Sequence, residues 1–207
     1  MIYISFDIGV KNLAYCILRQ QHHIVDIIDW GIICLAESKK KVKGVNTLSD
    51  NLFCELDNLL GKLQSIGIDS INYVIIENQP SNLNGIMKTL QYMIFTYFSL
   101  LRHWDSRVGE VVLINPSMKL QNHDFEPSSK QIDGKLSRAE KYKCNKADAI
   151  EICMHYIKDD EKLDKFFKSY KKKDDLADTC LQTISYIRKK GILVQRVGID
   201  KDNFLIS

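Results

Sequence analysis

The sequence predicts an α/β fold in which helices cover both faces of a mixed sheet. Three observations lead to this fold class. The chain begins with three extended apolar segments joined by short polar breaks, helical and strand patterns then alternate, and two further helical patterns follow. Breaks as short as the first two require antiparallel neighbours. The later alternation of strands and helices is typical of layered α/β domains.

The first half of the chain contains the predicted strands. Extended segments at 2–8, 13–18 and 24–35 are separated by the polar stretches GVKN and RQQHH. Leucines at helical spacing over 48–63 predict an amphipathic helix. A strand at 73–76, a helix over 86–101 and a strand at 110–114 complete this half.

The second half combines helices with polar segments. The stretch 120–143 has no apolar pattern, so we expect a long loop there, and loops of that length are often functional. Helical spacing returns over 147–157 and 177–187, and 191–207 is expected to be a C-terminal tail. Because no Pro/Gly/Ser-rich linker divides the chain, residues 1–207 are predicted to form a single domain.

Composition narrows the classes of function. The net charge of +3 does not by itself indicate a nucleic-acid partner, although Lys and Arg gather in runs at 39–43, 141–146, 168–173 and 188–190. Such runs are most often solvated surface. The six cysteines show no metal-ligand spacing and are typical of reduced core residues. With no leader and no apolar run that could cross a bilayer, we expect a soluble intracellular protein without a membrane partner.

Four acidic residues stand out by position. Asp7 and Glu77 each end an apolar strand, and open sheets bind ligands at such edges. Asp175 and Asp178 are three residues apart and share one face of the last helix. Clustered carboxylates repel one another unless a divalent cation neutralises them, and oxygen ligands favour Mg²⁺ or Mn²⁺. Gly9 would permit a tight turn beside the first acid. Structural explanations also exist, because acids commonly cap helices or occupy turns.

The segments FDIGVKNLAYCIL, IIENQP, KADAIEIC and DDLADTCL, in this order, resemble the RuvC-type Holliday junction resolvases of the ribonuclease H-like superfamily. The resemblance covers about residues 2–190 and is strongest to the branch of poxviruses, other large DNA viruses and mitochondria. It implies a five-stranded mixed sheet with the first three strands antiparallel, in agreement with the segments above. It also implies that Asp7, Glu77, Asp175 and Asp178 are catalytic metal ligands for Mg²⁺, for which Mn²⁺ can substitute.

The resemblance further implies a catalytic lysine ahead of the penultimate helix. In the run KYKCNK, Lys146 is the first choice, and Lys141 and Lys143 stay open. The implied activity is Mg²⁺-dependent, symmetric cleavage of four-way DNA junctions by a homodimer, in recombination, repair or the resolution of viral genome concatemers. The helix over 86–101 is a candidate dimer element, because apolar residues surround more of it than one core face needs. A poxviral relative would act in the host cytoplasm.

Three other interpretations stay open. A D-x-G strand followed by a hairpin also begins the actin-like and sugar-kinase fold, but those proteins need two such domains and this chain has length for one. A ribonuclease H-type or transposase-type nuclease would share the fold and differ in its substrate, for example an RNA–DNA hybrid. A non-catalytic DNA-binding module would have no reason to retain four acids that repel its ligand.

Overall fold

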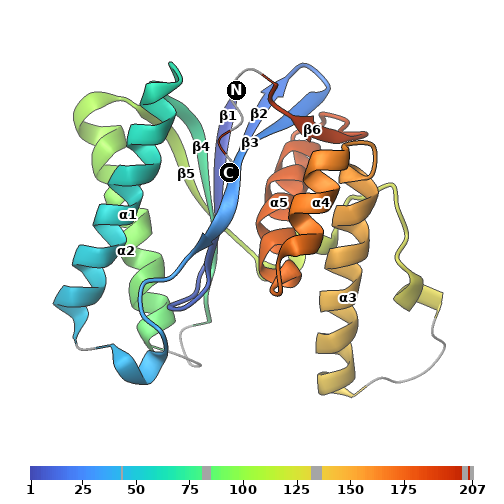
Figure 1. Ribbon diagram of the computed structural model, residues 1–207, viewed down its shortest axis with the longest axis horizontal. Helices are drawn as coiled ribbons and strands as arrows, with labels where there is room; N and C mark the ends of the chain where they lie inside the picture. The colour runs from blue at the N-terminus through green and yellow to red at the C-terminus, as the bar shows by residue number, and fades with distance from the viewer. Residues whose placement is uncertain (43, 81–84, 132–136, 202–204, 206–207) are drawn as a thin grey trace.

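Six strands form one mixed sheet in the computed structural model, in the order β5-β4-β1-β2-β3-β6 (Figure 1). The strands are β1 (Ile2–Asp7), β2 (Leu13–Gln21), β3 (Ile24–Ile33), β4 (Ile71–Glu77), β5 (Val108–Ile114) and β6 (Val197–Ile199). The structure describes residues 1–42, 44–80, 85–131, 137–201 and 205. Parts of the predicted basic run 39–43, loop 120–143 and tail 191–207 therefore lie outside the described residues.

Helices cover both faces of the sheet, as the sequence predicts (Figure 1). One face carries α1 (Val45–Ser65) and α2 (Gly85–Asp105). The other carries α3 (Arg138–Ile157), α4 (Glu161–Ser169) and α5 (Lys173–Lys189). Short 3₁₀ turns occur at η1 (Lys39–Lys41), η2 (Pro116–Leu120) and η3 (Ser128–Gln131). Within the described parts of the chain, no helix has the length and apolar character needed to span a bilayer.

The pairing of β1 decides which residues meet at the edge of the sheet. β1 pairs antiparallel with β2, and β2 pairs antiparallel with β3, as the short connections predict. On its other side β1 pairs parallel with β4, with Phe6 opposite Ile76, and β4 pairs parallel with β5. The carboxyl ends of β1, β4 and β5 therefore lie at the same edge, which brings Asp7 next to Glu77.

Two apolar clusters separated by the sheet hold the layers together. Ile4 and Phe6 of β1 pack in the cluster that contains the buried leucines of α1. Tyr3 belongs to the opposite cluster, together with α3 and α5. Burial on both faces explains why this central strand is almost continuously apolar.

Three predictions about individual elements were wrong. The sheet has six strands rather than five, because β6 lies within the predicted tail 191–207 and pairs parallel with β3. Helix α3 begins at Arg138, inside the predicted loop 120–143, so Lys141, Lys143 and Lys146 lie within a helix and not ahead of it. Helix α4 was not predicted at all.

Candidate active site

Four carboxylates meet where β1 and β4 end. Asp7 and Glu77 are the last residues of their strands, and Asp175 and Asp178 lie on the first two turns of α5. Burial raises the pKa of Asp7 well above its usual range, and the charges of Glu77, Asp178 and Asp175 act in the same direction. The structure thus brings together all four acids that the sequence singles out.

The same crowding affects the acids of α5. Burial raises the pKa of Asp178 to about 6, an effect that the Lys119 ammonium opposes and the charge of Glu77 reinforces. Burial, followed by the charge of Asp174, also raises the pKa of Asp175. A cation among these buried and mutually repelling carboxylates would offset both the burial of their charges and the repulsion between them.

Lys119 supplies part of that positive charge. Its Nζ atom lies 3.1 Å from Glu77 Oε2 and 2.5 Å from Asp178 Oδ2. Although burial acts in the opposite direction, these carboxylates raise the pKa of Lys119, so it stays a cation. Sequence reasoning missed this residue. The available signal was its place in η2, directly after β5, whose carboxyl end lies at the same edge as those of β1 and β4.

Lys146, the first choice from sequence for the catalytic lysine, pairs with an acid outside the set of four. Its ammonium forms an ion pair with Asp174, which precedes the predicted ligand Asp175. Burial opposes the change, but the hydrogen bond from Lys146 lowers the pKa of Asp174. The Nζ atom also lies 5.0 Å from the centroid of the Tyr142 ring. Lys146 therefore lies beside the acidic cluster, and Lys119 lies within it.

Buried polar contacts fix α5 against the sheet. Ser5 Oγ of β1 donates a hydrogen bond to the backbone oxygen of Thr179 at 2.6 Å. Gln182 Nε2 donates to Glu77 Oε2 at 3.2 Å, so the helix also orients a carboxylate of the sheet. The first turn of α5 has no side-chain cap at Lys172. The side chains of its acids instead reach other elements, which disfavours a purely capping role.

The turn after β1 depends on Gly9. A Cβ atom at this position would lie 2.1 Å from the backbone oxygen of Asn12, so only glycine fits without a backbone shift. The turn places Asn12 Nδ2 3.0 Å from Asp175 Oδ2, to which it donates a hydrogen bond. The predicted tight turn thus connects the strand that carries Asp7 to the helix that carries Asp175.

The chemistry of the donor set suits a hard divalent cation. Carboxylate oxygens are the ligands that Mg²⁺ and Mn²⁺ prefer. Among the described residues, no three His, Cys, Asp or Glu side chains are arranged to hold one metal ion as they stand. The Lys119 ammonium bridges Glu77 and Asp178 instead, in the place where a cation would compete for the same oxygens.

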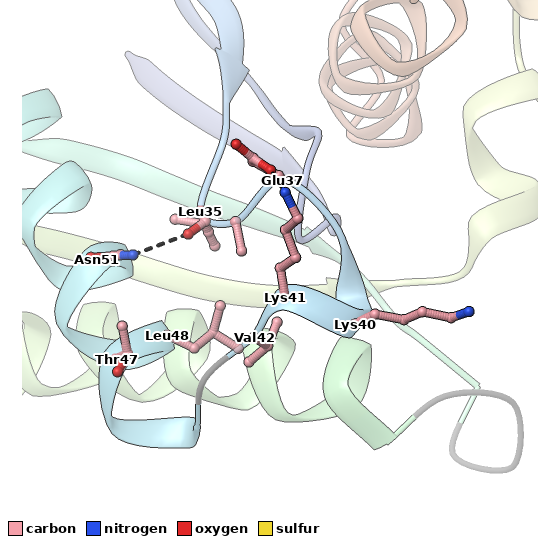
Figure 2. Close-up of a pocket in the computed structure, with 9 residues that line it drawn as sticks. Leu35, Glu37, Lys40, Lys41, Val42, Thr47, Leu48 and Asn51 are labelled. Atoms are coloured by element: carbon pink, nitrogen blue, oxygen red, sulfur yellow. Dashed lines mark hydrogen bonds and ion pairs between the residues drawn. The ribbon is translucent and has the colours of Figure 1, made fainter.

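A cavity of about 530 Å³ lies between the β3–α1 connection and the start of α1 (Figure 2). Asn51 Nδ2 donates to the backbone oxygen of Leu35 across it, and Lys41 pairs with Glu37. The backbone N–H of Leu35 donates to the Val10 oxygen at 2.9 Å, which ties this connection to the turn after β1. None of the four acids lines the cavity.

The topology and the acidic edge define a RuvC-like protein of the ribonuclease H fold. The chain belongs to the Poxvirus A22 protein family, a family of poxvirus Holliday junction resolvases, which matches residues 1–190. This confirms the resemblance and the fold class that the sequence predicts.

Solved structures share the fold at low sequence identity. The Fowlpox virus resolvase in complex with its substrate Holliday junction DNA has a TM-score of 0.57 at 20% identity, and the match covers 92% of this chain and 99% of that one. The yeast mitochondrial Holliday junction resolvase Ydc2 has a TM-score of 0.55 at 17% identity, covering 91% and 80%. Thermus thermophilus RuvC has a TM-score of 0.55 at 8% identity, covering 93% and 99%.

A curated relative matches part of the chain. The Uncharacterized protein L451 of Acanthamoeba polyphaga mimivirus is 30% identical over 148 residues, which is 68% of this chain and 34% of the relative. The chain thus spans about a third of the length of this relative.

Proposed function

We propose that this protein is a structure-specific endonuclease that cuts four-way DNA junctions by metal-dependent hydrolysis of phosphodiester bonds. The observation that carries the proposal is the convergence of four carboxylates and one lysine at one sheet edge, in a fold shared with Holliday junction resolvases. A pure DNA-binding module has no use for this cluster, because buried acids repel the phosphate backbone.

Asp7, Glu77, Asp175 and Asp178 would hold Mg²⁺, with Mn²⁺ as a substitute. The bound ion supplies an activated water and stabilises charge on the phosphate and the leaving oxygen. Asp7 is well suited to be a ligand because the central strand holds it rigidly. Asn12 and Gln182 hold their carboxylate partners in place through the hydrogen bonds at 3.0 and 3.2 Å.

Lys119 is the lysine best placed to act on the reacting phosphate. Its ammonium already lies between two of the proposed ligands. As a cation it can stabilise the negative charge that develops on the phosphate oxygens during attack. Lys146, the first choice from sequence, is bound to Asp174 and is better explained as a residue of the surrounding DNA surface.

The symmetry of the proposed substrate favours a dimeric assembly. A four-way junction has near two-fold symmetry, so a homodimer would present one active site to each of two opposed strands. Exposed apolar residues on α2 support a dimer surface there; they are Tyr92, Leu100 and Trp104. The basic runs would contact the phosphate backbone without reading its sequence.

The test is cleavage of a synthetic four-way junction, a linear duplex and an RNA–DNA hybrid, each with and without Mg²⁺. We expect paired nicks in the junction only with Mg²⁺, and no cleavage by Asp178→Asn with junction binding retained or tighter. Asp164→Asn, which removes an α4 acid paired with Lys168, is the matched control and should cut normally. Preferred cleavage of the hybrid would favour a ribonuclease H-type enzyme, and binding without cleavage would favour a DNA-binding module.

A further inference from the structure

Apart from the ion pair between Lys146 and Asp174, the first half of α3 carries a face that packs against no other part of the chain that the structure describes. None of the side chains from Arg138 to Ala147 is buried. The buried residues of this helix all follow, and they are Asp148, Ala149, Ile152, Cys153, Tyr156 and Ile157. Ten residues correspond to roughly 15 Å of helix. In Figure 1 this half of α3 extends past the end of α5.

The free face continues the face that packs on the domain. Arg138, Tyr142 and Asn145 follow one another at intervals of four and three residues. The same alternation leads on to the buried residues Ala149 and Ile152. Residues spaced in this way lie on one side of a helix. In its second half, α3 packs on the domain through this side. In its first half, the same side therefore faces the space beside the four acids.

The ion pair of Lys146 fixes the direction of that face. Lys146 lies on the same side of α3, and its ammonium reaches Asp174 on the first turn of α5. Asp174 is adjacent to Asp175, one of the proposed metal ligands. The half-helix is thus a wall next to the site.

The chemistry of this wall is basic and aromatic. Residues 138–147 contain four cations, Arg138, Lys141, Lys143 and Lys146, against the single acid Glu140. Tyr142 stands among them, 62% exposed, with the Lys146 ammonium 5.0 Å from its ring centroid. Cations that follow a phosphate backbone, combined with an exposed ring on which a base can stack, are the usual means of binding unpaired or unstacked nucleotides.

We propose that the first half of α3 binds the DNA strand next to the cut, with its cations on phosphates and the Tyr142 ring stacked on a base at the branch point. The inference rests on the proposed function and adds to it a place where the junction is opened. When the branch point is opened, its bases lose a stacking neighbour, and a protein ring can take the place of that neighbour. The positive charge of this half-helix favours a nucleic acid over an apolar protein partner.

The test uses a junction with 2-aminopurine at the branch point and the variants Tyr142→Ala and Tyr142→Phe. Stacking quenches 2-aminopurine, so wild type and Tyr142→Phe should quench it on binding and Tyr142→Ala should not. Tyr142→Ala should also raise the dissociation constant for the junction by about tenfold, with little effect on the dissociation constant for linear duplex. Phe53→Ala is the control, because Phe53 is an aromatic residue that is 36% exposed on α1, on the other face of the sheet from α3.

The cations have their own readout. Lys141→Ala should lower the slope of log affinity against log salt by about one. Lys165→Ala, which removes an α4 lysine paired with Glu161, should leave the slope unchanged. If the wild type cuts the junction while Tyr142→Ala quenches and binds as the wild type does, this inference is wrong and the proposed function stands. If the wild type neither prefers nor cuts the junction, the proposed function itself fails.

Discussion

Replacing Lys119 by Met separates its role in charge balance from the role that we propose for it in the reaction. The ammonium lies 3.1 Å from one carboxylate oxygen and 2.5 Å from another. At an effective dielectric constant of about 20, each contact is an attraction on the order of 5 kcal/mol, which the cost of removing the charges from water largely offsets. Deleting the cation alone leaves the acids uncompensated, so the free energy of unfolding of the metal-free protein should fall by about 3 kcal/mol.

Two assays measure the two roles. Urea unfolding in EDTA should show the loss of stability, and Mg²⁺ should reduce it, because a bound divalent cation supplies the missing charge. Single-turnover cleavage of bound junction at saturating Mg²⁺ should slow by ~10²-fold or more if Lys119 stabilises the transition state. Lys165→Met, which removes a surface partner of Glu161, should change neither quantity measurably. Cleavage by Lys119→Met at the wild-type rate would reduce Lys119 to a counterion and refute its catalytic role.

Three further predictions concern the surroundings of the site. Gly9→Ala should destabilise the protein by about 2 kcal/mol or more, measured by urea unfolding, because the new Cβ would lie 2.1 Å from the Asn12 oxygen. Burial holds the pKa of Asp178 at about 6 instead of 3.8, so the fold keeps a proton that the unfolded chain loses. The unfolding free energy of the metal-free protein should therefore decrease by up to about 3 kcal/mol as the pH is raised from about 4 to about 7 in a urea titration series. Lys146→Ala should bind junction more weakly yet retain most of the single-turnover rate, because Lys146 pairs with Asp174 outside the cluster.

Where local chemistry determines an element, the sequence predicted it well. The first three strands follow from connections too short for any other arrangement. Five leucines of α1 recur at helical spacing and are buried. The strand β6 could not be found in this way, because three residues are too few for an alternation and its place is set by pairing with β3. The polar first half of α3 has no apolar periodicity, so it was predicted to be a loop.

The acids were predictable for a related reason. Asp7 and Glu77 end strands whose apolar character is evident, and parallel neighbours bring such ends together. Asp175 and Asp178 lie at helical spacing on a helix with a clear apolar face. Lys119 has no such pattern around it. It reaches the cluster only because η2 follows β5 at the same edge. Its two partners, Glu77 and Asp178, are 42 and 59 residues away from it in the chain.

The same physical cause explains why α3 was mispredicted and why its first half can bind a partner. A helix without an apolar face gains no stability from packing, and isolated turns are marginal in water. Here the capping box of Ser137 and Glu140 and the contact between Lys146 and Asp174 hold the first turns in place. These contacts leave the rest of the basic and aromatic face without a protein neighbour among the described residues. Four cations against one acid make this surface complementary to a polyanion, and the phosphate backbone of DNA is the polyanion that we propose for it.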